Sequence, residues 1–373
     1  MFRLHDAGLL DNTLTSETTV KAIMDRNDGK GPGFDTLRLW LALCVLLVHG
    51  VAVAQYDQGL PLKLWNGPLR PFLLAILPMF FALSGFLVSG SAMRVRSAKI
   101  FLVLRLLRLW PALMVEVTLS ALVLGPIFTV VPLRQYFSDS LFLSYFGNIV
   151  GHVQFYLPGV FEAAPLAGVV NLNLWTLTPE YYCYAFMLLL LVSGTLFDRL
   201  KIAVIATIML AILGGGNTLF DLGESDTMYG APVLLMSFVA GACAYSWREH
   251  IVVRSDLFAL AIVTLYIAWS FHGAMALGLL PMIYCTVYLG MRPLPRLKWL
   301  PEGDYSYGIY LYGFPIQQAL VAIFPALKVW WALFPVAAVT TTIVAVISWH
   351  VIERPALSLK RIVTQSRALR TAS

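Results

Sequence analysis

The chain has 373 residues, of which 59% are hydrophobic and only 12% are charged. Soluble domains usually carry about 25% charged residues, so the composition excludes an ordinary soluble protein and indicates a polytopic membrane protein. The net charge of +6 would suit a nucleic-acid partner, but in a membrane protein a basic excess more often reflects cytoplasmic loops, and we expect no nucleic acid. The four cysteines all lie in apolar stretches without metal-ligand spacing, so we expect neither a disulfide framework nor a metal site.

Residues 1–33 are polar and lack a cleavable hydrophobic leader, which predicts a cytoplasmic tail. Apolar segments long enough to span a bilayer follow. The longest loop, about 129–173, contains a half-apolar piece, Tyr136–Val150, that suits a re-entrant or interfacial segment. We therefore expect an all-α fold with about ten transmembrane helices, at roughly 36–56, 70–92, 107–128, 174–197, 201–216, 229–247, 256–272, 274–291, 305–325 and 331–352.

The distribution of basic residues predicts the orientation. With the N-terminus inside, 22 of the 26 Lys and Arg residues fall in cytoplasmic segments, and only Lys63, Arg70, Arg134 and Lys328 fall on the other side. Because Lys and Arg are enriched in cytoplasmic loops, both termini should be cytoplasmic. We divide the chain into a cytoplasmic tail at 1–33, a transmembrane domain at 34–357 and a basic cytoplasmic tail at 358–373.

The first apolar segment contains Arg38 and His49, eleven residues apart. Eleven helical steps make three turns plus about 20°, so the two side chains should share a face, with His49 about 16 Å deeper. This depth is near the middle of a bilayer core about 30 Å thick, where an ionisable group usually marks a functional site. The alternative is an arginine that reaches the headgroups and a core histidine that bonds a neighbouring helix. In either case, His49 needs a partner on another helix.

Two further features carry charge. Arg105 and Arg108 share a helix face at the cytoplasmic start of the third segment, ahead of Pro111, where the helix restarts or kinks. Guanidinium groups match phosphate geometry, although a basic flank that contacts lipid phosphates is an equal alternative. Glu180 follows Pro179 near the outer start of the fourth segment. Its carboxylate could cap the helix, pair with a basic group or take part in catalysis.

The remaining motifs are polar groups within apolar segments. Ser84 could be imagined as a nucleophile, but small residues such as Ser84 and Gly85 more often permit close helix packing. The ninth segment has Tyr307 and Tyr310 three residues apart and Gln317 in mid-span. These side chains could bind a polar ligand or brace neighbouring helices.

In this order, the motifs resemble the integral-membrane acyltransferase-3 family over about residues 33–357. The matching patterns are Arg followed after ten residues by His, Phe-Phe-x-x-Ser-Gly-Phe-Leu, Arg-x-x-Arg, Trp-x-Leu-x-x-Glu-x-x-x-Tyr, Ser-Tyr-x-x-Tyr and Ile-Glu-Arg-Pro. The resemblance implies transfer of an acyl group, usually acetyl, from cytoplasmic acyl-CoA to hydroxyls of cell-surface polysaccharides, glycolipids or similar acceptors. It also implies a location in the bacterial cytoplasmic (inner) membrane.

The resemblance assigns roles to individual residues. His49 matches the family's essential histidine, Arg38 its paired arginine, Arg105 and Arg108 the arginine pair assigned to donor binding, and Glu180 the glutamate of the Trp-Thr-Leu-Thr-Pro-Glu stretch. We expect catalytic roles for His49, Arg38 and Glu180. As our own expectation, substrate contacts come from Trp175, Tyr307, Tyr310 and Gln317. The chain departs from the family at Tyr181 and Tyr182, where many members have Glu and Gln, and at Gly313, where many have His. The roles of those family residues therefore do not transfer.

Acyl transfer to a hydroxyl needs a base for the hydroxyl proton. Histidine suits this role because apolar surroundings favour a neutral imidazole. We expect His49 to act as general base, with Arg38 orienting it or the donor. A covalent acyl-His intermediate stays open, as do acylation of an amine, a lipid or an antibiotic, and an oligomeric assembly. The alternative class is a transporter or flippase with a solute path along His and Gln, although inverted repeats are not visible.

Overall fold

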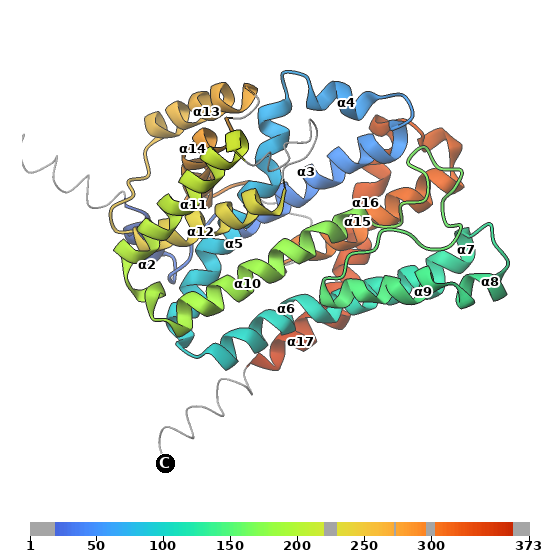
Figure 1. Ribbon diagram of the computed structural model, residues 1–373, viewed down its shortest axis with the longest axis horizontal. Helices are drawn as coiled ribbons and strands as arrows, with labels where there is room; N and C mark the ends of the chain where they lie inside the picture. The colour runs from blue at the N-terminus through green and yellow to red at the C-terminus, as the bar shows by residue number, and fades with distance from the viewer. Residues whose placement is uncertain (1–18, 220–229, 272–273, 296–302, 361–373) are drawn as a thin grey trace, which may run out of the picture. The chain divides into compact units, whose positions relative to one another are not determined.

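The computed structural model describes residues 19–219, 230–271, 274–295 and 303–360, without the side chains of 213–219. Within these ranges the chain forms helices and three isolated β-bridges but no strand, which confirms the all-α class. Residues 1–18 and 361–373 of the two expected tails lie outside the described ranges. A helix occurs in each of the ten apolar segments (Figure 1): α3 (Phe34–Gln55), α5 (Arg70–Val95), α6 (Ala98–Leu119), α10 (Leu177–Val192), α11 (Arg199–Leu219), α12 (Ala231–Ser246), α13 (Ser255–Ser270), α14 (Met275–Gly290), α15 (Ser306–Ile323) and α16 (Trp330–Ser348).

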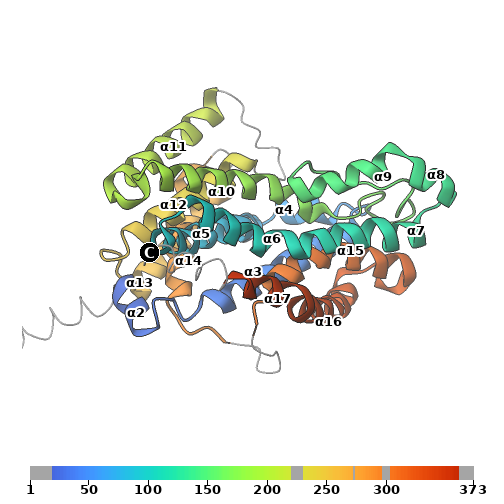
Figure 2. The same cartoon turned by 90° about the horizontal axis from the view of Figure 1, so that it is seen from below.

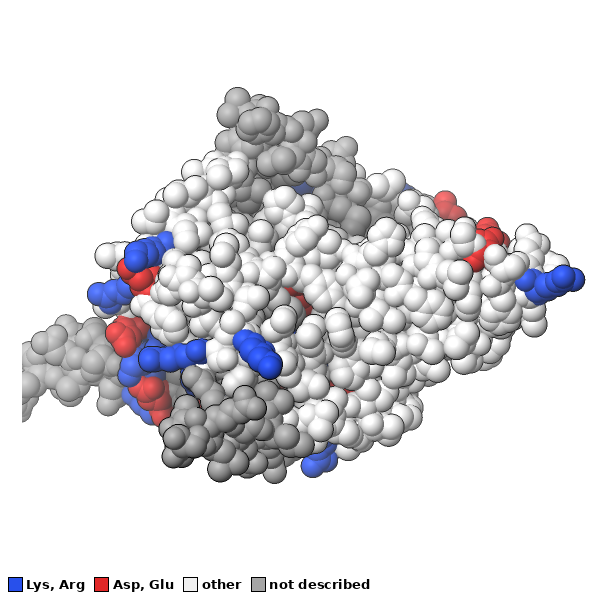
Figure 3. All heavy atoms as spheres, turned by 60° about the horizontal axis from the view of Figure 1, so that its bottom comes forward, with Lys and Arg blue, Asp and Glu red and all other residues white. Residues whose placement is uncertain are grey.

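Four helical stretches are long and apolar enough to cross a membrane, and the protein is a membrane protein. They are Phe34–Gln55, Arg70–Val95, Ala98–Phe128 and Trp330–Ser358. Large apolar side chains such as Trp331 and Val351 are exposed on the last of them. Most of the surface drawn in Figure 3 carries neither Lys, Arg, Asp nor Glu, as expected for a surface that meets lipid.

The third and tenth segments are longer than the sequence indicated. The third helix begins at Ala98, because the Ser97 hydroxyl accepts a hydrogen bond from the Ile100 amide and caps the helix nine residues before the expected start at 107. It continues through a π-helical turn, η1 (Ser120–Leu124), into α7 (Gly125–Phe128). The tenth likewise continues through η6 (Trp349–Glu353) into α17 (Arg354–Ser358). Arg354 therefore lies inside a helical stretch rather than at its end.

The chain forms two compact units. Unit 1 contains Met1–Arg38, Pro68–Arg94 and Leu189–Leu300, and unit 2 contains Leu39–Gly67, Val95–Leu188 and Pro301–Ser373. The helices of unit 1 are the start of α3, most of α5, the end of α10, and α2 (Val20–Arg26), η4 (Thr195–Phe197), α11, α12, α13 and α14.

Unit 1 is held together by close helix packing. A Cβ on Gly85 of α5 would collide with the Phe238 carbonyl of α12, and a Cβ on Gly241 would collide with the Ala82 carbonyl. The two backbones therefore touch at small residues, as the Ser-Gly motif predicted. Helix α2 is anchored by the Val20 amide, which donates to Ile251 O at 2.9 Å.

Unit 2 is built on α6, α15 and α16. Helices α15 and α16 form an antiparallel hairpin through η5 (Pro325–Leu327) and lie side by side (Figures 1 and 2). The remaining elements of unit 2 are α4 (Leu60–Trp65), α8 (Leu133–Ser138), α9 (Ser140–Tyr145), η2 (Phe146–Val150) and η3 (Leu172–Thr176). The expected half-apolar piece at 136–150 is thus helical, and η2 packs against α6. One apolar core cluster of unit 2 joins the end of α3 to α15 and α16 through Val53, Phe314 and Ala337.

Candidate active site

His49 lies on the part of α3 that belongs to unit 2. Its ring meets Phe314 of α15 edge-on, with the ring centroids 5.3 Å apart and an interplanar angle of 77°. The Nδ1 atom is buried and has no hydrogen-bond partner among the described residues. Another helix therefore supplies an aromatic contact, and not the hydrogen bond to Nδ1 that the sequence led us to expect.

The contact between α3 and α15 is tight around His49. The Gln317 side chain donates from Nε2 to the Leu46 carbonyl at 2.7 Å. A Cβ on Gly50 would lie 2.9 Å from Gln317 Nε2, and a Cβ on Gly313 would lie 2.7 Å from Leu46 Cδ1. Glycine at these two positions lets the helices approach, and Gln317 braces the turn of α3 that carries His49.

Arg38 lies on the same helix, in unit 1. Its guanidinium NH1 is 3.6 Å from Asp35 Oδ1, one turn earlier on α3, and Asp35 is largely exposed. Exposed pairs of this kind contribute little to stability, so the pair does not fix Arg38 in place. Helix α3 thus carries both Arg38 and His49, as expected.

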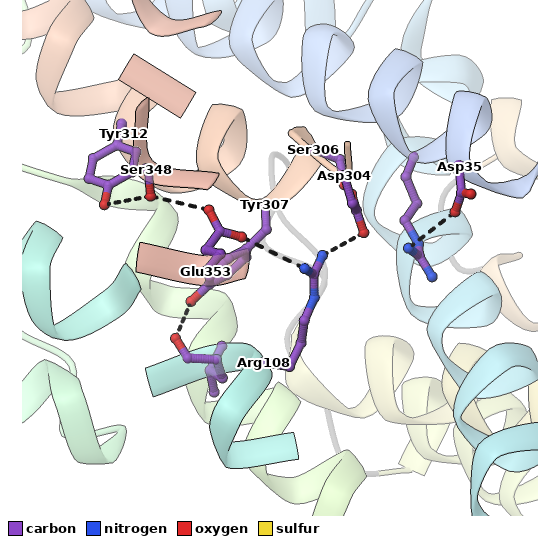
Figure 4. Close-up of polar contacts among 10 residues, drawn as sticks. Asp35, Arg108, Asp304, Ser306, Tyr307, Tyr312, Ser348 and Glu353 are labelled. Carbon is purple, nitrogen blue, oxygen red and sulfur yellow. Dashed lines mark hydrogen bonds and ion pairs between the residues drawn. The ribbon is translucent and has the colours of Figure 1, made fainter. Parts of the chain in front are cut away.

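Arg108 is the centre of a charged network in unit 2 (Figure 4). Its NH2 group is 2.6 Å from Asp304 Oδ2, and its NH1 group is 3.7 Å from Glu353 Oε2. Ser306 donates to the other oxygen of Asp304, and Ser348 donates to Glu353 Oε1. Two carboxylates therefore balance the charge of Arg108, a residue that the sequence predicted to bind an anion.

The aromatic residues near Arg108 complete this region. Tyr307 donates from its hydroxyl to the Leu109 carbonyl at 2.9 Å, and Arg108 lies 5.7 Å from the centroid of its ring. Arg105 lies 5.9 Å from the ring of Phe101 on its own helix. Tyr307 and Arg108 therefore lie next to each other, and Arg105 lies one turn earlier on α6.

Glu180 lies in the first turn of α10 and accepts a hydrogen bond from Tyr184, one turn later on the same helix. Arg108 and Arg105 are within electrostatic range of its carboxylate. The neighbouring Tyr181, which departs from the family pattern, accepts from Trp110 Nε1 at 3.1 Å and donates to the Ile149 carbonyl at 2.7 Å. A tyrosine here ties α10 to α6 and η2.

Tyr310 and Trp175 lie at the segment that leads into α10. The Tyr310 hydroxyl is 2.7 Å from Thr176 Oγ1, and its carbonyl accepts from Asn173 Nδ2. Trp175 lies in η3 and is partly buried. Tyr310 therefore braces this segment through its hydrogen bonds. Bracing was one of the two roles that the sequence left open for this side chain.

Glu116 is a residue that the sequence analysis missed. It is 1% exposed, and its Oε1 atom accepts from Ser120 and from Asn171 Nδ2, both at 2.9 Å. Asn171 also donates to the Leu311 carbonyl at 3.0 Å, which is open because Pro315, four residues later, has no amide hydrogen. A lone carboxylate inside the apolar third segment was the signal that could have identified it.

Within the described part of the chain, no group of three or more His, Cys, Asp and Glu side chains is arranged to hold a metal ion. His49 Nδ1 is one of several buried side-chain atoms of unit 2 that have no hydrogen-bond partner among the described residues. The candidate site therefore consists of the His49 imidazole on the apolar helix α3 and of Arg105 and Arg108 on α6, with carboxylates near them.

The comparisons with known proteins identify the class. Residues 32–350 match the family described as Acyltransferase domain, so the chain belongs to this family and is a membrane acyltransferase. It is 30% identical to Nodulation protein 10 of Rhizobium leguminosarum bv. viciae, over 90% of this chain and 96% of that protein. It is 25% identical to the O-acetyl transferase of Shigella phage Sf6, over 86% of this chain and 94% of that protein. No solved structure matches the chain.

Proposed function

We propose that the protein is an O-acyltransferase that moves an acetyl group from cytoplasmic acetyl-CoA, or another acyl-CoA, to a hydroxyl of a surface polysaccharide or glycolipid. The family membership and the similarity to an O-acetyl transferase support acyl transfer to oxygen. The donor and the class of acceptor come from the motif resemblance. With ten spans and both termini inside, the protein would work in a bacterial cytoplasmic membrane.

The observation that carries the proposal is His49. It is an ionisable residue on an apolar helix that is long enough to span a membrane, and the residue is partly and not fully buried. Such residues are expensive to keep in a membrane and usually serve a function. A neutral imidazole there can take a proton from a hydroxyl group.

The proposed reaction uses this imidazole as general base. His49 removes the proton from the acceptor hydroxyl as the oxygen attacks the thioester carbonyl carbon. The new C–O bond forms, the C–S bond breaks with its electron pair on sulfur, and the imidazolium returns its proton to the departing thiolate. A positioned base typically contributes about 10²–10⁴-fold to the rate of such a step.

We assign the phosphates of the donor to Arg105 and Arg108, because guanidinium groups bind phosphate in a bidentate way. Arg108 already bonds Asp304 and Glu353, so a phosphate has to exchange with one of them. Asp304 is the more accessible, with 19% of its side chain exposed against 3% for Glu353. Donor binding should therefore displace Asp304 and leave Glu353 in place.

The other candidate residues have narrower roles in this proposal. Arg38, near the start of α3, would orient His49 or the donor. Glu180 would act beside Arg105 and Arg108. Tyr307 and Trp175 stay as proposed substrate contacts. We propose that Tyr310 supports the site through its bonds to Asn173 and Thr176.

The test is acyl-CoA turnover in membranes that contain wild type or His49→Ala at matched protein levels, with bacterial envelope polysaccharide as acceptor. Loss of acceptor-dependent CoA release in the variant is the expected result. Equal turnover in the two would make His49 structural and remove the base from the mechanism. CoA release that requires the acceptor also distinguishes an acyltransferase from a transporter.

A second experiment decides between a general base and an acyl-His intermediate. The wild-type protein is incubated with radiolabelled acetyl-CoA and no acceptor. The general-base mechanism predicts no label on the protein. A labelled His49 peptide that disappears when acceptor is added would establish the covalent route.

A further inference from the structure

The two ring nitrogens of His49 have different surroundings. Nδ1 is enclosed in unit 2 without a hydrogen-bond partner among the described residues, whereas Nε2 is not enclosed in this way. His49 as a residue is partly exposed. Nε2 is therefore the ring nitrogen that a substrate hydroxyl would have to approach.

This difference determines which tautomer a base at His49 must have. A neutral imidazole carries one hydrogen, so an Nε2 that accepts a proton requires the hydrogen on Nδ1. A buried N–H without an acceptor is unfavourable, because nothing replaces the hydrogen bond it made to water. The reactive tautomer thus needs an acceptor near Nδ1.

Gln317 offers such an acceptor. Its side chain is fully buried, its Nε2 is held by the Leu46 carbonyl at 2.7 Å, and its Oε1 has no partner among the described residues. Leu46 and Gly50 lie on either side of His49 along α3; the Leu46 carbonyl accepts from this amide, and a Cβ added to Gly50 would lie 2.9 Å from its Nε2. Phe314, one turn before Gln317, contacts the His49 ring. A buried acceptor and a buried ring nitrogen, both unsatisfied, are therefore found at one helix crossing.

We infer that Gln317 is the positioning residue for His49: in the reactive state its Oε1 accepts a hydrogen bond from Nδ1–H and so directs Nε2 toward the acceptor hydroxyl. The inference rests on the proposed function, in which His49 is the base. It moves Gln317 from a substrate contact to a group that acts through His49. A base oriented by a third group is a general arrangement in acyl-transfer enzymes.

The next residue in the chain provides a matched control. Gln318 is also fully buried, donates from Nε2 to the Leu166 and Val169 carbonyls, and has an Oε1 without a partner in the described residues. It therefore has the same chemistry and the same burial, but its amide braces the 166–169 segment rather than α3. Replacing either glutamine removes one buried amide from α15.

The experiment compares kcat and KM of the full-length enzyme in membranes for Gln317→Leu, Gln318→Leu and His49→Ala, with acetyl-CoA and polysaccharide each varied. We expect Gln317→Leu to lower kcat by about 10–100-fold with little change in either KM, as for loss of an orienting partner. Gln318→Leu should retain kcat when corrected for folded protein. Gln317→Glu keeps an acceptor oxygen and should recover part of the lost kcat. If Gln317→Leu folds poorly, Gln317→Met takes its place and should show the same decrease in kcat.

Equal losses of kcat in Gln317→Leu and Gln318→Leu would overturn the inference, because a general packing effect would then explain both. A rise in the KM for polysaccharide with unchanged kcat would also overturn it, because Gln317 would then contact the substrate. Wild-type turnover in His49→Ala would instead refute the proposed function. The two failures are thus separate.

Discussion

Gly50→Ala tests the geometry around His49 with a single methyl group. The added Cβ would lie 2.9 Å from Gln317 Nε2. This atom is the far end of a flexible side chain, so the amide can move aside. In doing so it leaves the Leu46 carbonyl, to which it now donates at 2.7 Å.

The effect on stability should be small, because two contributions oppose each other. Alanine is favoured over glycine in a helix interior by about 1 kcal/mol. A buried amide that is left without its hydrogen-bond partner costs about 1–3 kcal/mol. The net change should be a loss of roughly 2 kcal/mol or less, which leaves a folded protein. The effect on kcat should be larger, because misplacing a catalytic group by about 1 Å can cost 10²-fold.

Gly313→Ala is the control on the facing helix. Its Cβ would lie 2.7 Å from Leu46 Cδ1, so it also adds one methyl to the α3–α15 contact and also displaces a flexible end. It does not approach the Gln317 amide in the same way. We expect the lower melting temperature for Gly50→Ala, because Gly313→Ala breaks no hydrogen bond, and a decrease in kcat of about 10–100-fold only for Gly50→Ala.

The assay is acceptor-dependent CoA release in membranes, with the melting temperature of each purified variant measured in detergent. Equal kcat in Gly50→Ala and wild type would contradict the reasoning, because the amide would then have moved without consequence. Equal decreases in both glycine variants would contradict it as well. That result would mean that the packing of α3 against α15 matters but the amide does not.

Three further predictions concern the carboxylates. Glu116→Leu should destabilise the protein by about 1–3 kcal/mol, since Ser120 loses a buried acceptor; an unchanged melting temperature would argue against this. Asp304→Asn should lower the KM for acetyl-CoA several-fold, because a phosphate then competes with one carboxylate fewer at Arg108; a higher KM would show that Asp304 helps donor binding. Glu180→Gln should reduce turnover without unfolding, and full turnover would reduce Glu180 to a structural role.

The ten helices could be predicted from apolar runs, because the hydropathy of a segment depends only on its own residues. The ends were harder to predict. Arg105 and Arg108 were expected at the start of the third helix, but the Ser97 cap extends that helix past them toward the N-terminus. The tenth segment, expected to end at 352, continues to Ser358, and Glu353 is buried within it.

The partners of the site residues could not be predicted, because they depend on long-range packing. Gln317 bonds a carbonyl 271 residues away, and Arg108 bonds an aspartate 196 residues away. Pro315 could have indicated an open carbonyl at Leu311, because a proline inside a helix has no amide hydrogen. That Asn171 fills this position could be known only from the fold.

Helix α15 connects the two ends of the proposed chemistry. Tyr307, in its first turn, lies against Arg108, where the donor phosphates are assigned. Gln317, ten residues later, braces the turn of α3 that carries His49. Ten helical residues span about 15 Å, so α15 sets the separation between phosphate and base. In the proposed mechanism an extended acyl-CoA bridges this distance, with its nucleotide at Arg105 and Arg108 and its thioester at His49. A change in the length of α15, or in its course near Pro315, should therefore impair transfer even where every polar side chain is retained.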